Sequence, residues 1–366
     1  MAREKKKKPL RVAVIGCGRI SPLHLRAAAE APEAKLVACC DVDRARARAT
    51  AAEYGIRAYT DFRKMIRRAR PDAVHICLPH HLHTLVANYC FMKKIHVISE
   101  KPMAIDMESA ERTVRYAELA GKQYGVIFQC RYNAPSRLVK EAVTSGRLGR
   151  ILSVRSVLTW NRPDSYYEGS NWKGTWDKEG GGVLIDQAIH SIDLVNWLVD
   201  SKIAEVSCTM ANRAHPTLDV EDSAEGLVIF ENGVRYGFYC MNNYETDSPI
   251  EIRLVCEKGE AVFGYDEAVI TYRDGSVERA HEEELVSDGD HIYWGTRHSC
   301  QIRQFYRACL GEEPLEISGA EALSTHRLIF ALYEAAKERG IHLVGREASP
   351  TPEDSDRERE LRWFLS

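Results

Sequence analysis

Short apolar runs alternate with helical stretches along residues 11 to 130 of the chain. The runs are rich in Val, Ile, Leu and Cys, whereas the stretches between them carry most of the Ala and charged residues. Continuous apolar strands separated by helices are typical of a parallel sheet covered on both faces, so the pattern predicts an α/β fold. The predicted strands are 11–17, 35–42, 72–79, 96–100 and 124–129, and the predicted helices are 22–32, 44–55, 61–71, 83–94 and 107–123.

The pattern changes after about residue 150, where strand-and-turn sequence takes over. Asn-Gly and Asp-Gly pairs mark two hairpin turns in this half, and helical stretches are few. We therefore predict a mainly antiparallel sheet with helices packed on one face. The predicted strand regions are 151–160, 203–213, 225–240 and 250–275, the turns are Asn232-Gly233 and Asp274-Gly275, and the helices are 184–199, about 297–310 and about 319–338.

A chain of 366 residues is too long for one ordinary core, so two domains are expected. We predict a basic flexible arm over 1–10, a nucleotide-binding domain over 11–130, a second domain over 131–345 and a charged tail over 346–366. The arm holds Lys5 to Lys8, a run that is either a solvated segment or an electrostatic contact. The tail ends in an apolar stretch, 361–365, which can dock on a neighbouring subunit.

Composition and charge limit which binding partners and which cellular location are expected. The formal net charge is −3 and no apolar run reaches the ~18 residues of a membrane helix, so neither nucleic acid nor a membrane is an expected partner. The charged start lacks the apolar stretch of a signal peptide, which favours a cytoplasmic protein. The eleven cysteines show no ligand spacing and lie in apolar surroundings, as reduced thiols do, so no metal is expected.

A glycine pair follows the first predicted strand and precedes the first helix. Gly16 permits the tight turn, and Gly18 lets the backbone approach a pyrophosphate at the helix N-terminus. The third glycine of the usual fingerprint is replaced by Ser21, so the motif alone is incomplete. The second strand ends in Asp41, which is 20 residues beyond Ser21, at the position from which an acid binds a ribose diol.

The identity of Asp41 bears on the choice of dinucleotide. A carboxylate there repels a 2′-phosphate, so the sequence favours NAD over NADP. Arg44 and Arg46 lie close enough to keep NADP as an alternative. A purely structural role for Asp41, as a cap for the next helix, remains an alternative.

The segment Glu100-Lys101-Pro102 follows the predicted strand 96–100 at the carboxyl edge of the parallel sheet. Ligands bind at that edge in open α/β folds, so the lysine ammonium is expected in the cofactor crevice. A cis peptide at Pro102 would aim it there, although sequence does not establish one.

The apolar helix predicted over 184–199 carries Asp186 and His190 four positions apart, hence on one face. Packing alone does not require this pair. The imidazole is suited to proton transfer, and the carboxylate is suited to orienting the groups that react. The alternatives are a core histidine bonded to a carbonyl and a carboxylate favoured by the helix dipole.

Six segments occur in an order that resembles the glucose-fructose oxidoreductase, inositol dehydrogenase and rhizopine catabolism (Gfo/Idh/MocA) family. The resemblance extends from about residue 10 to 340. It implies an N-terminal Rossmann dinucleotide-binding domain and a C-terminal α+β domain with an open, mainly antiparallel sheet that serves ligand binding and assembly into a homodimer or homotetramer. The segments are "VIGCGRIS", "LPHHLH", "SEKPMA", "FQCRYN", "SGRLGRI" and "GGGVLIDQAIHSIDL".

Members of this family typically oxidise or reduce a secondary alcohol on a sugar or cyclitol. The resemblance implies that Lys101, Asp186 and His190 surround the carbinol and the nicotinamide. We favour His190 as proton acceptor, Lys101 as polariser or relay and Asp186 as the orienting acceptor; the reverse split between Lys101 and His190 stays open. Some members carry Asn in place of Asp186. The residues expected at the cofactor are Gly16, Gly18, Arg19, Ile20, Asp41, Leu78, Pro79, His83, Glu100, Lys101, Pro102 and Gln129.

Five aromatic residues fall within seventeen positions of a polar, glycine-bearing segment, 160–176. Aromatic faces suit the C–H faces of sugar rings, while Lys173 or Arg162 can meet a carboxylate or phosphate. The alternative is a loop packed over the crevice or at a subunit contact. The residues expected at the substrate are Arg131, Tyr167, Trp172, Lys173, Trp176, Asp186, His190 and His298, and the aromatic set also includes Trp160 and Tyr166.

Three hypotheses of function follow. The first is an NAD-dependent dehydrogenase acting on a secondary hydroxyl, C3 of a hexose derivative, because the aromatic segment resembles the branch that holds UDP-N-acetylglucosaminuronate 3-dehydrogenase and glycoside 3-oxidoreductases. The second is redox-neutral glycoside cleavage through a 3-keto intermediate and elimination. The third is a non-catalytic NAD-binding regulator. His80, His81 and His83 have no acidic or cysteine partners arranged for a metal.

Overall fold

The computed structural model describes residues 8–264, 266–282, 287–288, 291–292, 297–339 and 342–343. Nearly all of the basic arm and all of the charged tail predicted above lie outside these residues. None of the helices in the described ranges is both long enough and apolar enough to cross a membrane.

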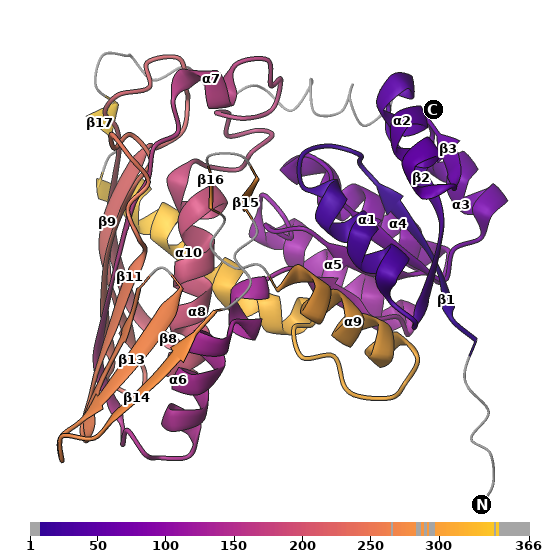
Figure 1. Cartoon of the computed structure of the whole chain (residues 1–366). Helices are drawn as coiled ribbons and strands as arrows, with labels where there is room; N and C mark the ends of the chain where they lie inside the picture. Colours follow the sequence, from indigo (N-terminus) through magenta and orange to yellow (C-terminus); the bar gives the residue numbers. More distant parts are fainter. Residues whose placement is uncertain are drawn as a thin grey trace, which may run out of the picture.

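Six parallel strands form the first sheet, in the order β3-β2-β1-β4-β5-β6 (Figure 1). This order is the doubly wound arrangement in which a crevice opens where the strand order reverses, here between β1 and β4. The prediction of a parallel α/β sheet is confirmed, and the short β3 is an addition. The elements are β1 (Leu10–Ile15), α1 (Ser21–Glu30), β2 (Ala34–Cys40), α2 (Arg44–Tyr54), β3 (Arg57–Tyr59), α3 (Phe62–Ala69), β4 (Ala73–Ile76), a 3-10 turn (His80–Leu82), α4 (His83–Met92), β5 (His96–Ser99), α5 (Met107–Ala120) and β6 (Tyr124–Val126).

Aspartates set the starts of three of these helices. Asp43 accepts hydrogen bonds from the backbone amides of the first turn of α2, and Asp61 and Asp106 do the same for α3 and α5. A side-chain oxygen at this position satisfies amide groups that have no partner within the helix. The caps therefore fix where each strand gives way to its helix.

The second sheet has nine strands in the order β14-β13-β12-β11-β7-β10-β9-β8-β17. Its pairs are antiparallel except β7 with β10 and β8 with β17, so the prediction of a mainly antiparallel sheet is confirmed. Its elements are β7 (Ile151–Thr159), β8 (Ile203–Asn212), β9 (Ser223–Phe230), β10 (Arg235–Met241), β11 (Glu251–Cys256), β12 (Gly259–Phe263), β13 (Glu267–Tyr272), β14 (Val277–His281) and β17 (His342–Leu343), and β15 (Ser287–Asp288) pairs with β16 (His291–Ile292) in a separate ribbon.

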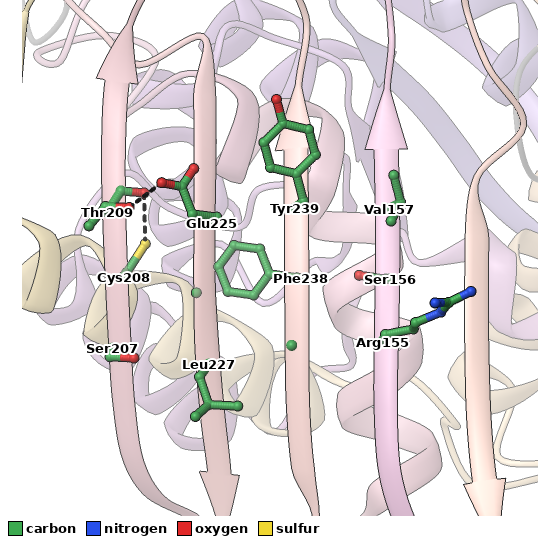
Figure 2. Close-up of a pocket in the computed structure, with 12 residues that line it drawn as sticks. Arg155, Ser156, Val157, Ser207, Cys208, Thr209, Glu225, Leu227, Phe238 and Tyr239 are labelled. Atoms are coloured by element: carbon green, nitrogen blue, oxygen red, sulfur yellow. Dashed lines mark hydrogen bonds between the residues drawn. The ribbon is translucent and has the colours of Figure 1, made fainter.

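Helices cover one face of the nine-stranded sheet and lie between it and the first domain (Figure 1). They are α6 (Ala134–Thr144), α8 (Ile189–Val199) and α10 (Gly319–Arg339), which leaves the other face open. Figure 2 shows this open face, where side chains such as Arg155, Leu227 and Tyr239 project from three neighbouring strands. Residues alternate between the two faces, as the period of a strand requires.

The C-terminal half also completes the first domain. Helix α9 (His298–Cys309) packs against α1 and β5, and α10 contacts α5 as well as α8. Ile302, Phe305 and Tyr306 of α9 are fully buried in one cluster with Leu10 and Ile98 of the first sheet. The two halves of the sequence therefore share buried contacts rather than meeting only at a linker.

The helix predicted over 184–199 is divided. Residues Leu184–Ala188 form a π turn, and α8 begins only at Ile189. The buried carboxylate of Glu221 accepts the amide hydrogens of Gly182 (2.9 Å) and Leu184 (3.0 Å) at the start of this segment. A single π turn within a helix is frequently found at a functional site. Apolar periodicity does not report it, because a π turn keeps the same residues buried.

Candidate functional site

The β1–α1 turn has the geometry that a dinucleotide needs. Gly16 has φ +94°, and a Cβ built on it would lie 2.0 Å from the carbonyl oxygen of Cys77, so only glycine fits. A Cβ on Gly18 would meet nothing within 4 Å, which leaves open space in front of the N-terminus of α1. Open space beside a helix N-terminus suits a pyrophosphate.

Asp41 lies beside this turn at the end of β2. Its carboxylate is buried and accepts the amide hydrogens of Cys17 (2.9 Å) and Asp43 (2.8 Å). These bonds orient it toward the glycine turn, where a ribose hydroxyl would meet it. Arg46 is 3.6 Å from the same carboxylate, so the local charge is partly balanced.

His83 joins two segments of the crevice. Its ring nitrogens lie 2.7 Å from the carbonyl oxygen of Leu78 and 2.7 Å from that of Pro102. The half-buried Leu78 and Pro79 are thereby held opposite the segment that carries Lys101, whose peptide bond to Pro102 is cis. His83 thus ties the two loops to each other by contacts within the protein.

Lys101 and Asp186 form the centre of the site. The Lys101 ammonium donates to the backbone oxygen of Asp186 (2.7 Å) and to its carboxylate (3.0 Å). Burial works to lower the pKa of Lys101, but the charges of Asp186 and Glu100 outweigh it and raise the pKa above its usual value. Burial works to raise the pKa of Asp186, but Lys101 and Lys173 hold it well below its usual range. The pair is therefore an ammonium and a carboxylate.

His190 is half-buried and lies against the edge of the Phe128 ring. Burial, then the Lys101 charge, lowers the pKa of its imidazole to about 3. Its Nδ1 is buried and has no hydrogen-bond partner among the described residues. His190 is thus a neutral base with an unused nitrogen beside a fixed ammonium.

A segment between β7 and the π turn covers Asp186 from the other side. It includes the short α7 (Asp164–Tyr167), and its Tyr166 hydroxyl donates to the Asp186 carboxylate (3.0 Å). Lys173 donates to the Tyr166 hydroxyl (2.7 Å) and to the Asp186 carboxylate (3.3 Å). The Trp172 ring lies 4.7 Å from the His80 ring, whose Nε2 is 3.8 Å from Asp186. One carboxylate therefore joins both domains and this covering segment.

Three residues expected at the substrate make other contacts. Arg131 is buried, with its guanidinium 2.6 Å from Asp193 and 2.8 Å from Glu321. The Tyr167 hydroxyl accepts from Asn242 (2.8 Å), and the Trp176 indole donates to the Asp219 carbonyl (2.7 Å). Their polar groups are therefore already bonded within the protein.

The remaining predicted residues flank the crevice. His298 is buried, with Nε2 3.6 Å from Glu100, and Gln129 is buried with an oxygen that lacks a partner among the described residues. Arg19 is exposed and Ile20 half-buried at the start of α1. The buried Gln301 of α9 accepts the Phe128 amide hydrogen (3.0 Å) and donates to the Val126 carbonyl (2.7 Å).

Sequence reasoning missed two contacts of the Asp186 carboxylate. It did not identify Tyr166 as the tyrosine that bonds Asp186, because adjacent tyrosines in a helical turn point in different directions that sequence does not reveal. It gave His80 no role at Asp186, since the two lie 106 positions apart and meet only through the fold. No group of three or more side chains suited to hold a metal ion occurs in the described part of the chain.

Comparison with known proteins identifies families and relatives that this chain resembles. Residues 10–128 match the profile "Oxidoreductase family, NAD-binding Rossmann fold", and residues 136–262 match "GFO/IDH/MocA C-terminal domain". D-glucoside 3-dehydrogenase of Escherichia coli (strain K12) is 27% identical over 357 residues, which cover 90% of this chain and 96% of that protein.

Two solved structures share the fold along nearly the whole chain. The WlbA dehydrogenase from Bordetella pertussis, solved with NADH and UDP-GlcNAcA, is 29% identical with a TM-score of 0.79, covering 91% of this chain and 98% of that one. Levoglucosan dehydrogenase, solved with NADH and levoglucosan, has a TM-score of 0.81 at 22% identity. The match covers 91% of this chain and 98% of that one. The two profiles together cover about two thirds of the chain, which therefore belongs to the Gfo/Idh/MocA family of NAD-binding oxidoreductases.

Proposed function

We propose that this protein moves a hydride between NAD and a secondary hydroxyl, at C3, of a sugar or glycoside. The observation that supports it most is the Lys101–Asp186 ion pair beside His190, at the edge of the sheet that carries the dinucleotide turn. The name of the E. coli relative, a D-glucoside 3-dehydrogenase, supports the same carbon and substrate class.

The protein's residues divide the proton chemistry among them. The Lys101 ammonium, held by two oxygens of Asp186, has a third hydrogen to donate to the substrate oxygen. His190 is neutral and can accept the hydroxyl proton, whereas Lys101 is already protonated and cannot. A bound nicotinamide supplies the hydride acceptor, and the residues expected to hold it are Gly18, Asp41 and the segment around Pro79.

The charges around the pocket favour a neutral glycoside over an acidic sugar. Lys173 donates to the Tyr166 hydroxyl and is paired with the ionised Asp186 carboxylate, 3.3 Å away. Arg162 is 3.1 Å from Asp247, and Arg131 is paired as described. An incoming carboxylate or phosphate would have to break one of these pairs, whereas a neutral ring can stack on Trp172 without doing so.

Tyr166 and Lys173 favour a second candidate function, redox-neutral cleavage of the glycoside. Elimination from a 3-keto sugar requires removal of the proton at C2 and delivery of a proton to the departing aglycone oxygen. The Tyr166 hydroxyl, bonded to Lys173, is a proton-transfer group on the opposite side of Asp186 from Lys101. Its use would leave His190 free for the redox step.

The test is a single-turnover reaction of purified protein that carries NAD. Methyl glucosides, free hexoses, uronates and UDP-sugars are added separately, and nicotinamide absorbance and products are followed. Reduction by the methyl glucoside and not by the UDP-sugar supports the proposal, and the reverse overturns the neutral-substrate argument. Release of free sugar without net NADH indicates cleavage. Loss of every turnover in His190→Ala with retained NAD binding excludes a purely regulatory role.

We also propose that the open face of the nine-stranded sheet joins copies of the chain into a dimer or tetramer. Leu227, Tyr239 and Val255 are each more than a third exposed, and Arg155 is paired with Glu251 on the same sheet. Figure 2 shows Leu227, Tyr239 and Arg155 on this face. Exposed apolar side chains gathered on one face are typical of an interaction surface.

A further inference from the structure

Four buried side chains form a hydrogen-bonded row that starts at Glu100 and ends in helix α9. Glu100 Oε1 is 2.9 Å from His24 Nε2, and His24 Nδ1 is 2.9 Å from His75 Nδ1. His75 Nε2 is 2.8 Å from the Tyr306 hydroxyl. His24, His75 and Tyr306 are 0% exposed and Glu100 is 6% exposed, so water does not compete for these bonds. The proposed reaction uses none of His24, His75 and Tyr306.

The Tyr306 hydroxyl determines the direction of the row, that is, which side chain of each pair donates the hydrogen. Within the described part of the chain its hydrogen-bond partner is His75 alone. A buried hydroxyl hydrogen without an acceptor costs about 1–3 kcal/mol, so the hydrogen points at His75 Nε2. Burial lowers the pKa of His75 well below its usual value, so the ring is neutral and carries its single hydrogen on Nδ1.

The rest of the row follows from that one choice. His75 Nδ1–H donates to His24 Nδ1, so His24 carries its hydrogen on Nε2 and donates it to Glu100. Every hydrogen in the row points toward Glu100, which must be an ionised carboxylate to accept it. Burial works to raise the pKa of Glu100, but the hydrogen bond from His24 and the His298 ring 3.6 Å away hold it well below its usual range.

The charge fixed in this way acts on the proposed reaction site. Glu100 Oε2 accepts the backbone amide hydrogen of Lys101 (3.2 Å), and its charge contributes to the raised pKa of the Lys101 ammonium. The opposite direction of the row would leave the Tyr306 hydrogen without an acceptor, and it would require either a protonated Glu100 or a doubly protonated His24. Because the row ends at a fully buried hydroxyl, it does not conduct protons to solvent.

We propose that Tyr306, His75 and His24 are positioning residues that hold Glu100 ionised against Lys101, and so make helix α9 part of the reaction site. Their effect on activity rests on the proposed function, whereas their hydrogen arrangement does not. The groups that face Glu100 are His24 of α1, Cys77 after β4, His83 of α4, the adjacent Lys101, His190 of α8 and His298 of α9.

The first test reads the hydrogen positions in the free protein. Two-bond ¹H–¹⁵N correlation spectra of histidine-labelled protein distinguish Nδ1–H from Nε2–H rings, and His24→Gln and His75→Gln variants assign the signals. The expected result is His24 protonated on Nε2 and His75 protonated on Nδ1, both neutral, at pH 7. His75 protonated on Nε2, or either ring doubly protonated, overturns the proposal whatever the substrate is.

The second test removes the group that sets the direction. In Tyr306→Phe, His75 Nε2 has no partner whether or not it carries a hydrogen, so neither direction of the row is favoured. The arrangement in which Glu100 is protonated therefore becomes easier to reach. We expect the acidic limb of the kcat–pH profile to move upward by roughly 0.5 to 1 pH unit and His75 to show both tautomers. The matched control is Tyr124→Phe, because the buried Tyr124 hydroxyl has no partner among the described residues. An unmoved limb with unchanged tautomers in Tyr306→Phe overturns the proposal, as does an equal shift in the control.

Discussion

Replacing Asp186 by Asn tests the centre of the site, because the substitution removes one charge and changes few atoms. One carboxylate oxygen accepts from Tyr166 (3.0 Å), Lys173 (3.3 Å) and Gln187 (2.6 Å), and the other from Lys101 (3.0 Å). In Asn, one of these oxygens becomes an amide donor that faces donors. Two buried ammonium groups also lose their counter-charge.

The magnitude follows from these contacts. Two unit charges 3.0 Å apart attract by about 5 kcal/mol at an effective dielectric constant of ~20. Breaking a buried pair while one partner stays charged costs about 3–5 kcal/mol. We therefore expect the thermal midpoint of Asp186→Asn to fall by roughly 5 °C at pH 7, and kcat to fall by about 100-fold or more because Lys101 loses its orientation.

The pH dependence gives a second readout of the same variant. Asp186 raises the pKa of Lys101 in the wild type, so the ammonium persists to high pH. Without that charge, burial is opposed mainly by Glu100 and the pKa of Lys101 falls, so Asp186→Asn should lose its remaining activity at a lower pH than the wild type does. The assay is kcat against pH for both proteins.

The matched control is Glu179→Gln. Burial raises the pKa of Glu179 to about 8, so this carboxyl is mostly neutral at pH 7 and a neutral amide replaces it closely. We expect its midpoint and kcat to stay within about 2 °C and twofold of the wild type. The reasoning is refuted if Asp186→Asn matches the wild type in both measurements, or if Glu179→Gln loses as much as Asp186→Asn.

Four further outcomes are expected. Asp41→Ala should weaken the preference for NAD over NADP, measured as the ratio of dissociation constants; an unchanged ratio would place Asp41 away from the ribose. Gly18→Ala should keep the wild-type melting temperature and lose NAD affinity, whereas Gly16→Ala should lower the melting temperature, because its Cβ would overlap the Cys77 carbonyl. Because the Glu179 pKa is raised to about 8, its contribution weakens the folded state as the pH rises from about 4.5 to 8, so the stability of Glu179→Gln relative to the wild type should rise over this range; parallel melting curves would contradict this. Leu227→Asp should shift light-scattering mass toward the monomer, and an unchanged oligomer would exclude this face.

The sequence predicted the parallel sheet, the second sheet and the glycine turn well, because each depends on local patterning. Alternating apolar strands and helices identified the first domain, and Gly16 has the positive φ that its turn requires. The free cysteines also match the expectation, since all eleven are unbridged in the structure.

What the sequence did not predict depends on contacts between distant segments. The pairing of Arg131 gave no signal, because the two carboxylates that bind it lie 62 and 190 positions away. Tyr306 gave no signal in an ordinary amphipathic helix, although it meets His75 across 231 positions. Local periodicity reports which face of an element is buried, not which polar partner it meets there.

The most direct test of the proposed reaction follows the hydrogen itself. A methyl glucoside carrying deuterium only at C3 is mixed with the NAD-loaded protein for one turnover, and the nicotinamide is analysed by mass spectrometry. The proposal predicts that the deuterium is found on the nicotinamide and that the sugar becomes a 3-ketone. A reduced nicotinamide without deuterium would contradict it.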